Sequence, residues 1–257
     1  MAGKSFKAKL IAAGGAVLVA GLALGIVLAA NADTSSMSSG FPRGSDSVDL
    51  DAADFSANID NPRWPMIVGS RWVYRVVDTS DGSVQRDVIN VTNRTKMIAD
   101  GIEARVVSDI VSDRGNPTEV TKDWYAQDSD GNVWYFGENT VEYKHGKPTD
   151  NGTWEAGVGG NLPGLALPAE PEVGMSYREE YSKGVAEDQS RVLALDEQAQ
   201  VPAGHYNDVL ITEDFSPIEP NVSELKFYAP GSGQAVLAVD VSGGSDMEQL
   251  VKYTPTR

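Results

Sequence analysis

The side chains in this sequence that could do chemistry are mainly aromatic and acidic residues in short alternating segments. Aromatic residues concentrate in Arg71–Val76 and in Asp123–Glu138, where the period of two is typical of strands. Such residues either pack into a core or line an apolar pocket inside a barrel. On the second interpretation, the candidate ligand-binding residues are Trp72, Tyr74, Trp124, Trp134 and Phe136.

No established catalytic motif is present in the sequence. It lacks G-x-S-x-G, H-E-x-x-H and a P-loop, so we assign no catalytic residue. Neighbouring carboxylates are numerous, among them Glu179-Glu180, Glu187-Asp188 and Asp128 with Asp130. Two carboxylates at a suitable separation are the machinery of a glycosidase. Because the acids are so abundant, the sequence singles out no pair, and a carboxylate-dependent hydrolase stays an alternative.

Metal and cofactor chemistry has little support in the sequence. There is no Cys, and the two His residues, His145 and His205, stand in polar, turn-like surroundings. The acidic segment Asp128–Asn132 invites a calcium interpretation. If Gly131 takes position 6 of an EF-hand loop, Ala126 and Gly137 take positions 1 and 12, and neither can bind calcium. We therefore expect no metal and no cofactor, and interpret this segment as a hairpin turn.

The first 32 residues have the pattern of a bacterial export signal. Three lysines precede the apolar run from Leu10 to Ala30, and Ala30-Asn31-Ala32 matches an A-x-A cleavage site. The run has 21 residues, which is also about the length that crosses a bilayer. The chain is therefore cleaved after Ala32 and secreted or held in the cell envelope, or it keeps a single N-terminal membrane anchor.

Composition limits what the exported part can do. Without the three lysines of residues 1–32 it holds 18 basic and 37 acidic residues, a formal charge of −19. This charge argues against binding to nucleic acid. The segment 33–60 is rich in Ser, Asp, Gly and Ala, and its composition predicts a disordered linker.

Residues 61–257 are predicted to form a single antiparallel β domain. Short alternating segments recur with turn residues between them, and no segment of the exported part has a capped helical period. This spacing predicts an all-β barrel, half-barrel or sandwich behind the N-terminal apolar helix and the linker. The segment 151–174, rich in Gly and Pro, is predicted to be a long loop or flap.

The central hairpin allows a register to be predicted. A three-residue loop, Ser129–Gly131, with Gly131 in the left-handed region, places Lys122 opposite Glu138 and Trp124 opposite Phe136. It gathers Trp124, Ala126, Trp134 and Phe136 on one face and leaves Tyr125 on the other. A two-residue loop would instead pair Asp123 with Glu138, two like charges. We therefore predict the three-residue loop.

Three stretches together resemble a family of uncharacterised exported bacterial proteins. They are Asn61–Arg75 with P-x-x-x-G-x-x-W-x-Y, the hairpin DWYAQDSDGNVWYFGE, and VPAGHYND with FYAPGSG near the C-terminus. The last pair is also distantly similar to TapB-like exported proteins. The resemblance implies an antiparallel β architecture and no assigned catalytic residue. Ser232 departs from the small apolar residue expected at its position.

The sequence therefore predicts a non-enzymatic envelope or secreted protein. Its expected partner is a small apolar ligand in the barrel or an envelope protein. Contact with a membrane is expected only through an uncleaved N-terminal segment. The rival class is the glycosidase-like hydrolase.

Overall fold

The structure is a computed structural model that describes residues 40–98, 101–144, 146–150 and 152–256. The predicted export signal, with Ala30 and Ala32 at its cleavage site, lies outside the described residues, as does His145. In the described part of the chain, no helix is long and apolar enough to cross a membrane.

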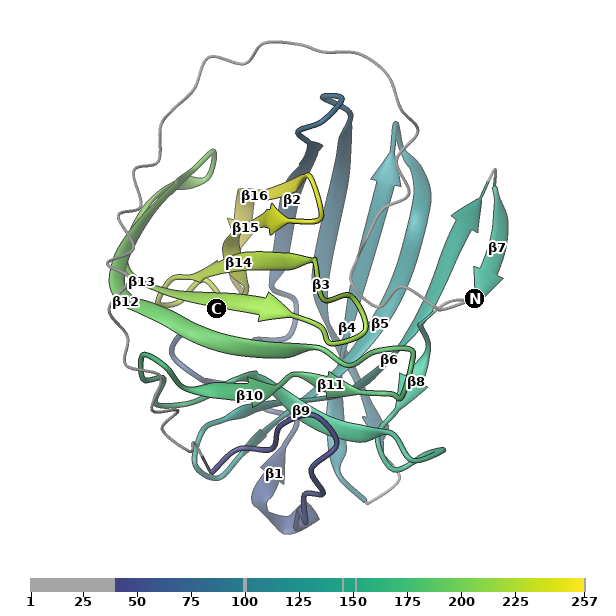
Figure 1. The fold of residues 1–257 in the computed structure, drawn as a ribbon, viewed down its shortest axis with the longest axis vertical. Coiled ribbons are helices and arrows are strands. Elements are labelled where there is room, and N and C mark those ends of the chain that lie inside the picture. The colour runs from purple at the N-terminus through teal and green to yellow at the C-terminus, as the bar shows by residue number, and fades with distance from the viewer. Residues whose placement is uncertain (1–39, 99–100, 145, 151, 257) are drawn as a thin grey trace.

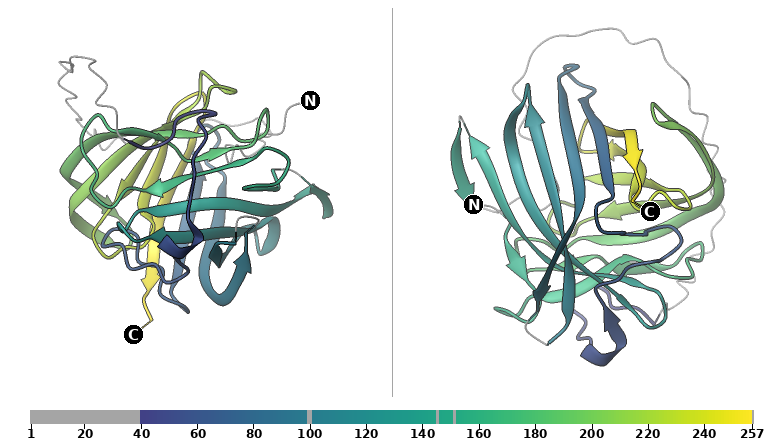
Figure 2. Two further views of the ribbon diagram at one scale, coloured as in Figure 1. Left: turned by 90° about the horizontal axis from the view of Figure 1, so that it is seen from below. Right: turned by 180° about the vertical axis from the view of Figure 1, so that it is seen from behind.

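The described chain folds into antiparallel strands, which confirms the all-β prediction. After one 3-10 turn, η1 (Ala52–Asp54), the strands are β1 (Phe55–Ser56), β2 (Arg71–Asp78), β3 (Val84–Met97), β4 (Glu103–Asp113), β5 (Asn116–Asp128), β6 (Val133–Lys144), β7 (Lys147–Asp150), β8 (Trp154–Glu155), β9 (Leu162–Leu167), β10 (Ser176–Arg178), β11 (Glu180–Tyr181), β12 (Gln189–Val201), β13 (Gly204–Phe215), β14 (Ser223–Tyr228), β15 (Ala235–Ser242) and β16 (Asp246–Thr254). They curl into a nearly closed barrel (Figures 1 and 2).

The two ends of the sheet are joined through a single residue of the chain. Its order is β10-β12-β13-β14-β15-β16-β2-β3-β4-β5-β6-β9-β11. The two end strands, β10 and β11, are consecutive in the chain, and only Glu179 separates them. The Glu179 amide donates to the Asp188 carbonyl at 2.8 Å. Gly164 of β9 lies so close that a Cβ there would overlap the Glu179 carbonyl. We call residues 178–180 the seam of the barrel.

The prediction of a disordered linker over 33–60 is wrong for residues 40–60. β1 pairs with β5, Phe55 opposite Asp128, and Ile59 is buried. Phe41 meets the ring of Tyr177 edge-on at 6.5 Å between centroids. A few widely spaced apolar residues therefore anchor a segment whose overall composition resembles that of a disordered chain.

The central hairpin has the predicted loop but not the predicted register. Asp128 and Asn132 flank a three-residue loop, and Gly131 has φ of 90°. Further along, however, Asp123 pairs with Glu138 and Lys122 with Asn139. Two residues of β6, Phe136 and Gly137, lie opposite one residue of β5, which is a β-bulge.

Gly137 makes this bulge possible. Its φ is 123°, and a Cβ would overlap the carbonyl of Trp154, because β8 pairs with β6 at this point. The faces nevertheless come out as predicted. Trp124 and Phe136 are buried on the face opposite to Tyr125.

One face of the sheet carries both apolar and acidic side chains along β2, β3, β4 and β5. Cross-strand pairing places Ile89 beside Asp109 and Val107 beside Asp123 on this face. The apolar and acidic side chains include Trp72 and Asp78 in β2, Val91 and Asp87 in β3, Val107 and Asp109 in β4, and Tyr125 and Asp123 in β5. This face lines the concave side of the barrel, as the ring contacts described below show.

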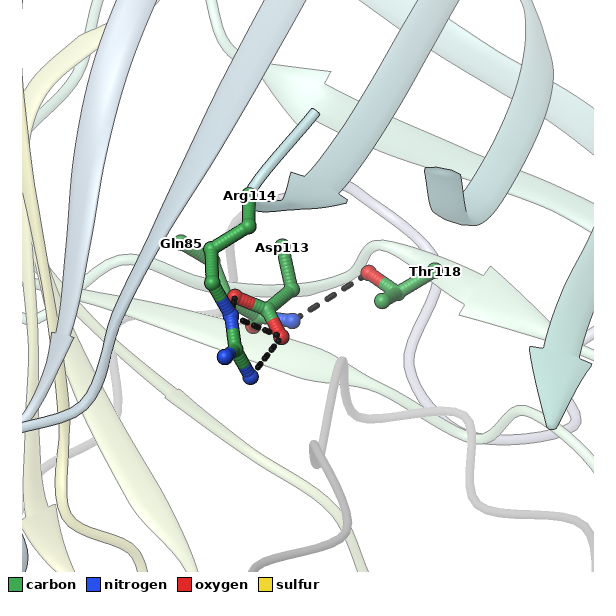
Figure 3. Close-up of polar contacts among 4 residues, drawn as sticks. All are labelled: Gln85, Asp113, Arg114 and Thr118. Carbon is green, nitrogen blue, oxygen red and sulfur yellow. Dashed lines mark hydrogen bonds and ion pairs between the residues drawn. The ribbon is translucent and has the colours of Figure 1, made fainter. Parts of the chain in front are cut away.

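At the tip of the β4–β5 hairpin the contacts are those of an exposed turn. Arg114 has φ of 47°, and its guanidinium lies against the Asp113 carboxylate at 3.2 Å. Behind it, Gln85 of β3 donates to Thr118 of β5 at 3.2 Å (Figure 3). Exposed ion pairs of this kind contribute little to stability.

Candidate functional site

A chain of ring contacts crosses the concave face. Trp64 stacks on Tyr228 of β14, with ring centroids 5.4 Å apart, and lies 5.9 Å from Tyr125 of β5. Tyr125 stacks on Tyr135 at 4.8 Å, and Tyr135 meets Trp154 edge-on at 5.5 Å. Five strands separate β14 from β5 in the sheet, so these contacts span the interior. We call the five rings the aromatic row.

Trp64 reaches the interior because the loop before β2 folds into the barrel. The Asn61 carboxamide oxygen accepts from the amides of Arg63 and Trp64, and its nitrogen donates to the Gly131 carbonyl at 2.9 Å. The Trp64 side chain is buried, and its indole N–H has no hydrogen-bond partner among the described residues. The aromatic row therefore includes a buried donor with no acceptor in this part of the chain.

The Tyr135 hydroxyl lies between two carboxyl groups. It is 2.9 Å from Asp123 Oδ1 and 3.2 Å from Glu138 Oε2. Burial raises the pKa of Tyr135 well above its ordinary value, and Asp123 and Glu138 raise it further. A phenol has one hydrogen to donate. Both contacts can be hydrogen bonds at once only when one carboxyl group carries a proton.

The far end of the aromatic row connects to the seam. The Trp154 indole donates to Glu180 Oε2 at 2.8 Å. The Glu180 carboxyl in turn lies beside that of Asp188, which also faces the Ser216 hydroxyl. A continuous set of polar contacts therefore runs from the aromatic row to the point where the barrel closes.

Four carboxyl groups surround one lysine next to the seam. Lys226 Nζ lies 2.5 Å from Asp214 Oδ2 and 3.7 Å from Glu224 Oε2. Glu179 and Asp188 also act electrostatically on this group. Asp214 is buried, while the side chains of Lys226 and Glu224 are 29% and 20% exposed. We call Glu179, Asp188, Asp214, Glu224 and Lys226 the seam cluster.

The seam cluster holds more acid than base, and this shifts its protonation. Burial raises the pKa of Glu179 well above its usual value, and Asp214 adds to the effect. Burial also raises the pKa of Asp188, and raises that of Glu224 to about 7. For Lys226, burial lowers the pKa, but Asp214 and then Glu179 outweigh it and leave a net pKa well above the usual value. Burial in the cluster therefore favours the neutral form of these carboxyl groups beside a charged ammonium group.

Two further polar atoms next to the cluster are incompletely satisfied. The hydroxyls of Tyr177 and Ser190 lie side by side on β10 and β12. Both residues are almost fully buried, and neither oxygen completes a hydrogen bond of normal geometry with the described residues. The seam therefore buries polar groups without complete hydrogen bonding, which is unfavourable for the stability of this part of the barrel.

The structure separates the five residues predicted to bind a ligand into two groups. Trp72 and Tyr74 lie on the concave side, where their polar atoms donate to the carbonyls of Ser232 and Ala235. The Ser232 hydroxyl also lies 2.7 Å from the Ala229 carbonyl, so this serine fits its turn.

The second group lies on the other face of the sheet. The Phe55 ring covers Trp134 and Phe136 there, at 6.1 and 5.5 Å between centroids. On the same face Lys96 Nζ lies 4.6 Å from the ring centre of Trp124. The five predicted residues therefore form no common pocket, and whether any of them contacts a ligand stays a prediction.

Sequence reasoning missed the residues of the aromatic row. The available signal was the alternation Asp123, Tyr125 in one strand and Tyr135, Glu138 in the next, which places aromatic and acidic groups on one face. The members of the seam cluster gave no comparable signal, because they come from four separate segments.

In the residues that the structure describes, no group of three or more His, Cys, Asp or Glu side chains is arranged to hold a metal ion. Asp128, part of the rejected calcium loop, accepts from the amides of Asp130 and Asn132, from the Asn132 side chain and from the Trp134 indole. These bonds are the normal function of an aspartate in a turn.

The similarity of this chain to known proteins is weak. No family model matches the chain, and no curated protein matches it. A solved structure from Bacteroides fragilis, described as a "putative exported protein with YmcC-like fold", is 12% identical and has a TM-score of 0.42. That match covers 75% of this chain and 98% of that one. A "putative lipoprotein" from Parabacteroides distasonis is 10% identical with a TM-score of 0.42, and the match covers 76% and 99%. The resemblance to exported β-rich proteins described above stays a prediction.

Proposed function

We propose that the protein is a non-enzymatic, exported binding protein whose concave face holds a positively charged organic group. The observation that carries the proposal is the Tyr135 hydroxyl placed between Asp123 and Glu138 within the aromatic row. A cation beside carboxylates and over ring faces gains from both kinds of contact.

The same geometry argues against the small apolar ligand that the sequence suggested. An apolar ligand in the aromatic row would leave the Trp64 indole N–H without an acceptor. It would also cover Asp123 and Glu138 with hydrocarbon, which is unfavourable for charged groups. A ligand that carries an ammonium or guanidinium group together with hydrogen-bond acceptors avoids both costs.

Titration calorimetry with spermidine as a cationic probe and decanoate as an apolar probe tests this proposal. We expect spermidine to bind, and its Kd to rise about tenfold or more in Asp123→Asn and in Glu138→Gln, the scale of one lost charge-assisted hydrogen bond. Glu172→Gln is the matched control, because Glu172 is exposed. Binding of decanoate alone, or spermidine binding that neither variant changes, would contradict the proposal.

Export and cleavage after Ala32 belong to the same proposal. The supporting observation is the basic, apolar and A-x-A pattern of residues 1–32. Intact mass of the protein from culture medium and from membranes tests it. A chain in the membrane fraction that still begins at residue 1 or 2 would show that the segment is an anchor.

One observation supports the rival hydrolase. Asp123 and Glu138 meet at a single hydroxyl, and two nearby carboxyl groups of unequal protonation are what acid–base catalysis requires. A panel of 4-nitrophenyl glycosides tests this alternative. Turnover that disappears in both Asp123→Asn and Glu138→Gln would favour the enzyme over the binding protein.

A further inference from the structure

The indole of Trp64 differs from other buried indoles of the barrel in its hydrogen bonding. The indole N–H groups of Trp72, Trp134 and Trp154 each donate to an oxygen atom of the protein. That of Trp64 is also buried, yet it meets no acceptor among the described residues. A buried donor without an acceptor is unfavourable in a fold. The Trp64 N–H is therefore available to an acceptor that comes from outside the chain.

The loop around Trp64 holds this donor in place. The Trp64 amide donates to the carbonyl and to the side-chain oxygen of Asn61, at 3.0 and 3.1 Å. The Asn61 amide donates to the side chain of Gln127 in β5 at 2.8 Å, and the Met66 amide donates to the Ile59 carbonyl at 2.9 Å. These bonds fix the loop against the sheet. A donor that is fixed before binding loses little freedom when an acceptor arrives.

The Trp64 ring also lies close to the carboxyl groups of the proposed cation site. Its centroid is 5.9 Å from that of Tyr125, and the Tyr125 centroid is 4.8 Å from that of Tyr135. The Tyr135 hydroxyl in turn contacts Asp123 and Glu138. Two ring contacts therefore separate the indole from the carboxyl groups. A ligand that follows these rings contacts the indole at one end and the carboxyl groups at the other.

The charges near Trp64 decide which kind of acceptor fits. Arg63, the neighbour of Trp64 in the chain, directs its guanidinium to backbone carbonyls. In the other direction, the aromatic row leads to Asp123 and Glu138. A carboxylate bound by the Trp64 N–H would be repelled by these two acids. An uncharged carbonyl oxygen accepts the same hydrogen bond without that repulsion.

We propose that Trp64 determines the ligand specificity of the concave face, and that the ligand is an alkylamine with an uncharged carbonyl group at its other end. The ammonium group lies beside Asp123 and Glu138, and the carbonyl oxygen accepts from the Trp64 N–H. The aliphatic chain between them packs on the rings of Tyr125 and Tyr135. This inference rests on the proposed cation site and adds the second group that the site recognises.

Titration calorimetry of the full chain with three amines of similar length tests the proposal. N-acetylcadaverine carries an amide carbonyl, 6-aminohexanoate carries a carboxylate, and hexylamine carries neither. We expect N-acetylcadaverine to bind about fivefold or more tightly than hexylamine, the scale of one hydrogen bond to a buried donor. We expect 6-aminohexanoate to bind less tightly than N-acetylcadaverine. Equal Kd values for N-acetylcadaverine and hexylamine, or tightest binding of 6-aminohexanoate, would overturn the proposal.

Two variants assign the preference to the indole. Trp64→Phe keeps an aromatic ring and removes the N–H, so the preference for N-acetylcadaverine should disappear while the Kd of hexylamine changes little. Trp124→Phe is the matched control, because Trp124 lies on the opposite face of the sheet beneath Lys96, and it should keep the preference. A preference that survives in Trp64→Phe would show that another group recognises the carbonyl.

A measurement on the native chain replaces the variant if Trp64→Phe does not fold. The NMR signal of the Trp64 indole N–H should move when N-acetylcadaverine is added and should not move with hexylamine. A signal that responds to neither amine would overturn the role of Trp64.

The cation site and the role of Trp64 fail in different ways. If none of the amines binds, both proposals are wrong. If N-acetylcadaverine and hexylamine bind equally and both lose affinity in Asp123→Asn, the cation site stands and only the role of Trp64 is wrong.

Discussion

Two basic side chains lie in the closing region of the barrel, and their partners differ in kind. Arg178 is fully buried, and its guanidinium donates to backbone carbonyls: twice to Pro163, once to Gly44 and once to Asp46. Burial lowers the pKa of Arg178 to about 10, which leaves it charged at neutral pH. Carbonyls do not titrate, so this arrangement is the same over the whole physiological pH range.

Lys226 faces carboxyl groups instead. Its side chain is 29% exposed and lies near Glu224, whose pKa burial raises to about 7. The charge around Lys226 therefore changes near neutral pH, where Glu224 titrates, whereas the carbonyls that accept from Arg178 do not titrate. The comparison indicates that Arg178 has a structural role, because it joins the segment 40–46 to β9. The charge of the groups around Lys226, by contrast, changes with pH.

The largest expected effect comes from removing the structural cation. Arg178→Met removes the buried donor to the carbonyls of Pro163, Gly44 and Asp46 and should lower the free energy of unfolding by about 3–5 kcal/mol. The loss should be equal at pH 5 and pH 8, measured by denaturant unfolding. Arg191→Met is the control. Arg191 forms a surface pair with Glu213, and its loss should cost under about 1 kcal/mol. Equal losses in the two variants would show that Arg178 is not the structural anchor.

Lys226→Met should cost less and should depend on pH. The variant leaves Asp214 buried without its cation, a loss of about 1–3 kcal/mol. The loss should be greater at pH 8 than at pH 5, because Glu179 and Glu224 are ionised to a larger extent at pH 8. Unfolding curves at the two pH values provide the measurement. A loss that does not vary with pH would make Lys226 a second structural cation and remove the contrast with Arg178.

The sequence predicts the strands of this barrel better than it predicts the sites. Alternation is a local property, so it correctly indicated antiparallel β structure and the two faces of the central hairpin. The register failed because of a bulge at Gly137, where the crossing of β8 requires a glycine. The segment 151–174, predicted as a loop or flap, contains β8 and β9. Its buried run Pro163–Leu167 has no alternation to reveal it.

The candidate site could not be predicted for a different reason. Glu179, Asp214 and Lys226 each look like ordinary polar positions in or between strands. They meet because β10, β12, β13 and β14 are neighbours in the sheet, in a register that aligns Tyr177 with Ser190, Ser190 with Asp214 and Asp214 with Glu224. This meeting depends on three successive strand registers, and no local pattern encodes them.

Glu224→Gln tests how far titration at the seam cluster affects stability. The folded-state pKa of Glu224 is about 7, above its usual 4.5. The folded protein therefore retains a proton that the unfolded chain releases, and the free energy of unfolding falls as pH rises from 4.5 to 7. With the 20% exposure of the side chain, we expect this contribution to be about 1–2 kcal/mol. In Glu224→Gln the stability curve should be flatter over that range. A slope equal to that of the native chain would show that other groups produce it.

The smallest expected effect is that of Tyr177→Phe, which is compared with Tyr135→Phe. The hydroxyl of Tyr177 completes no normal hydrogen bond with the described residues, whereas that of Tyr135 has two carboxyl partners. Tyr177→Phe removes a buried polar atom that gains little in the fold, so stability should stay the same or rise by up to about 1 kcal/mol. Tyr135→Phe leaves Asp123 and Glu138 without their shared donor and should cost about 1–3 kcal/mol. Denaturant unfolding of both variants at pH 7 provides the measurement. A loss in Tyr177→Phe as large as that in Tyr135→Phe would show that the Tyr177 hydroxyl forms a good hydrogen bond in the fold. The polar groups of the seam would then be as well satisfied as the guanidinium of Arg178, and Arg178 and Lys226 would differ only in whether their partners titrate.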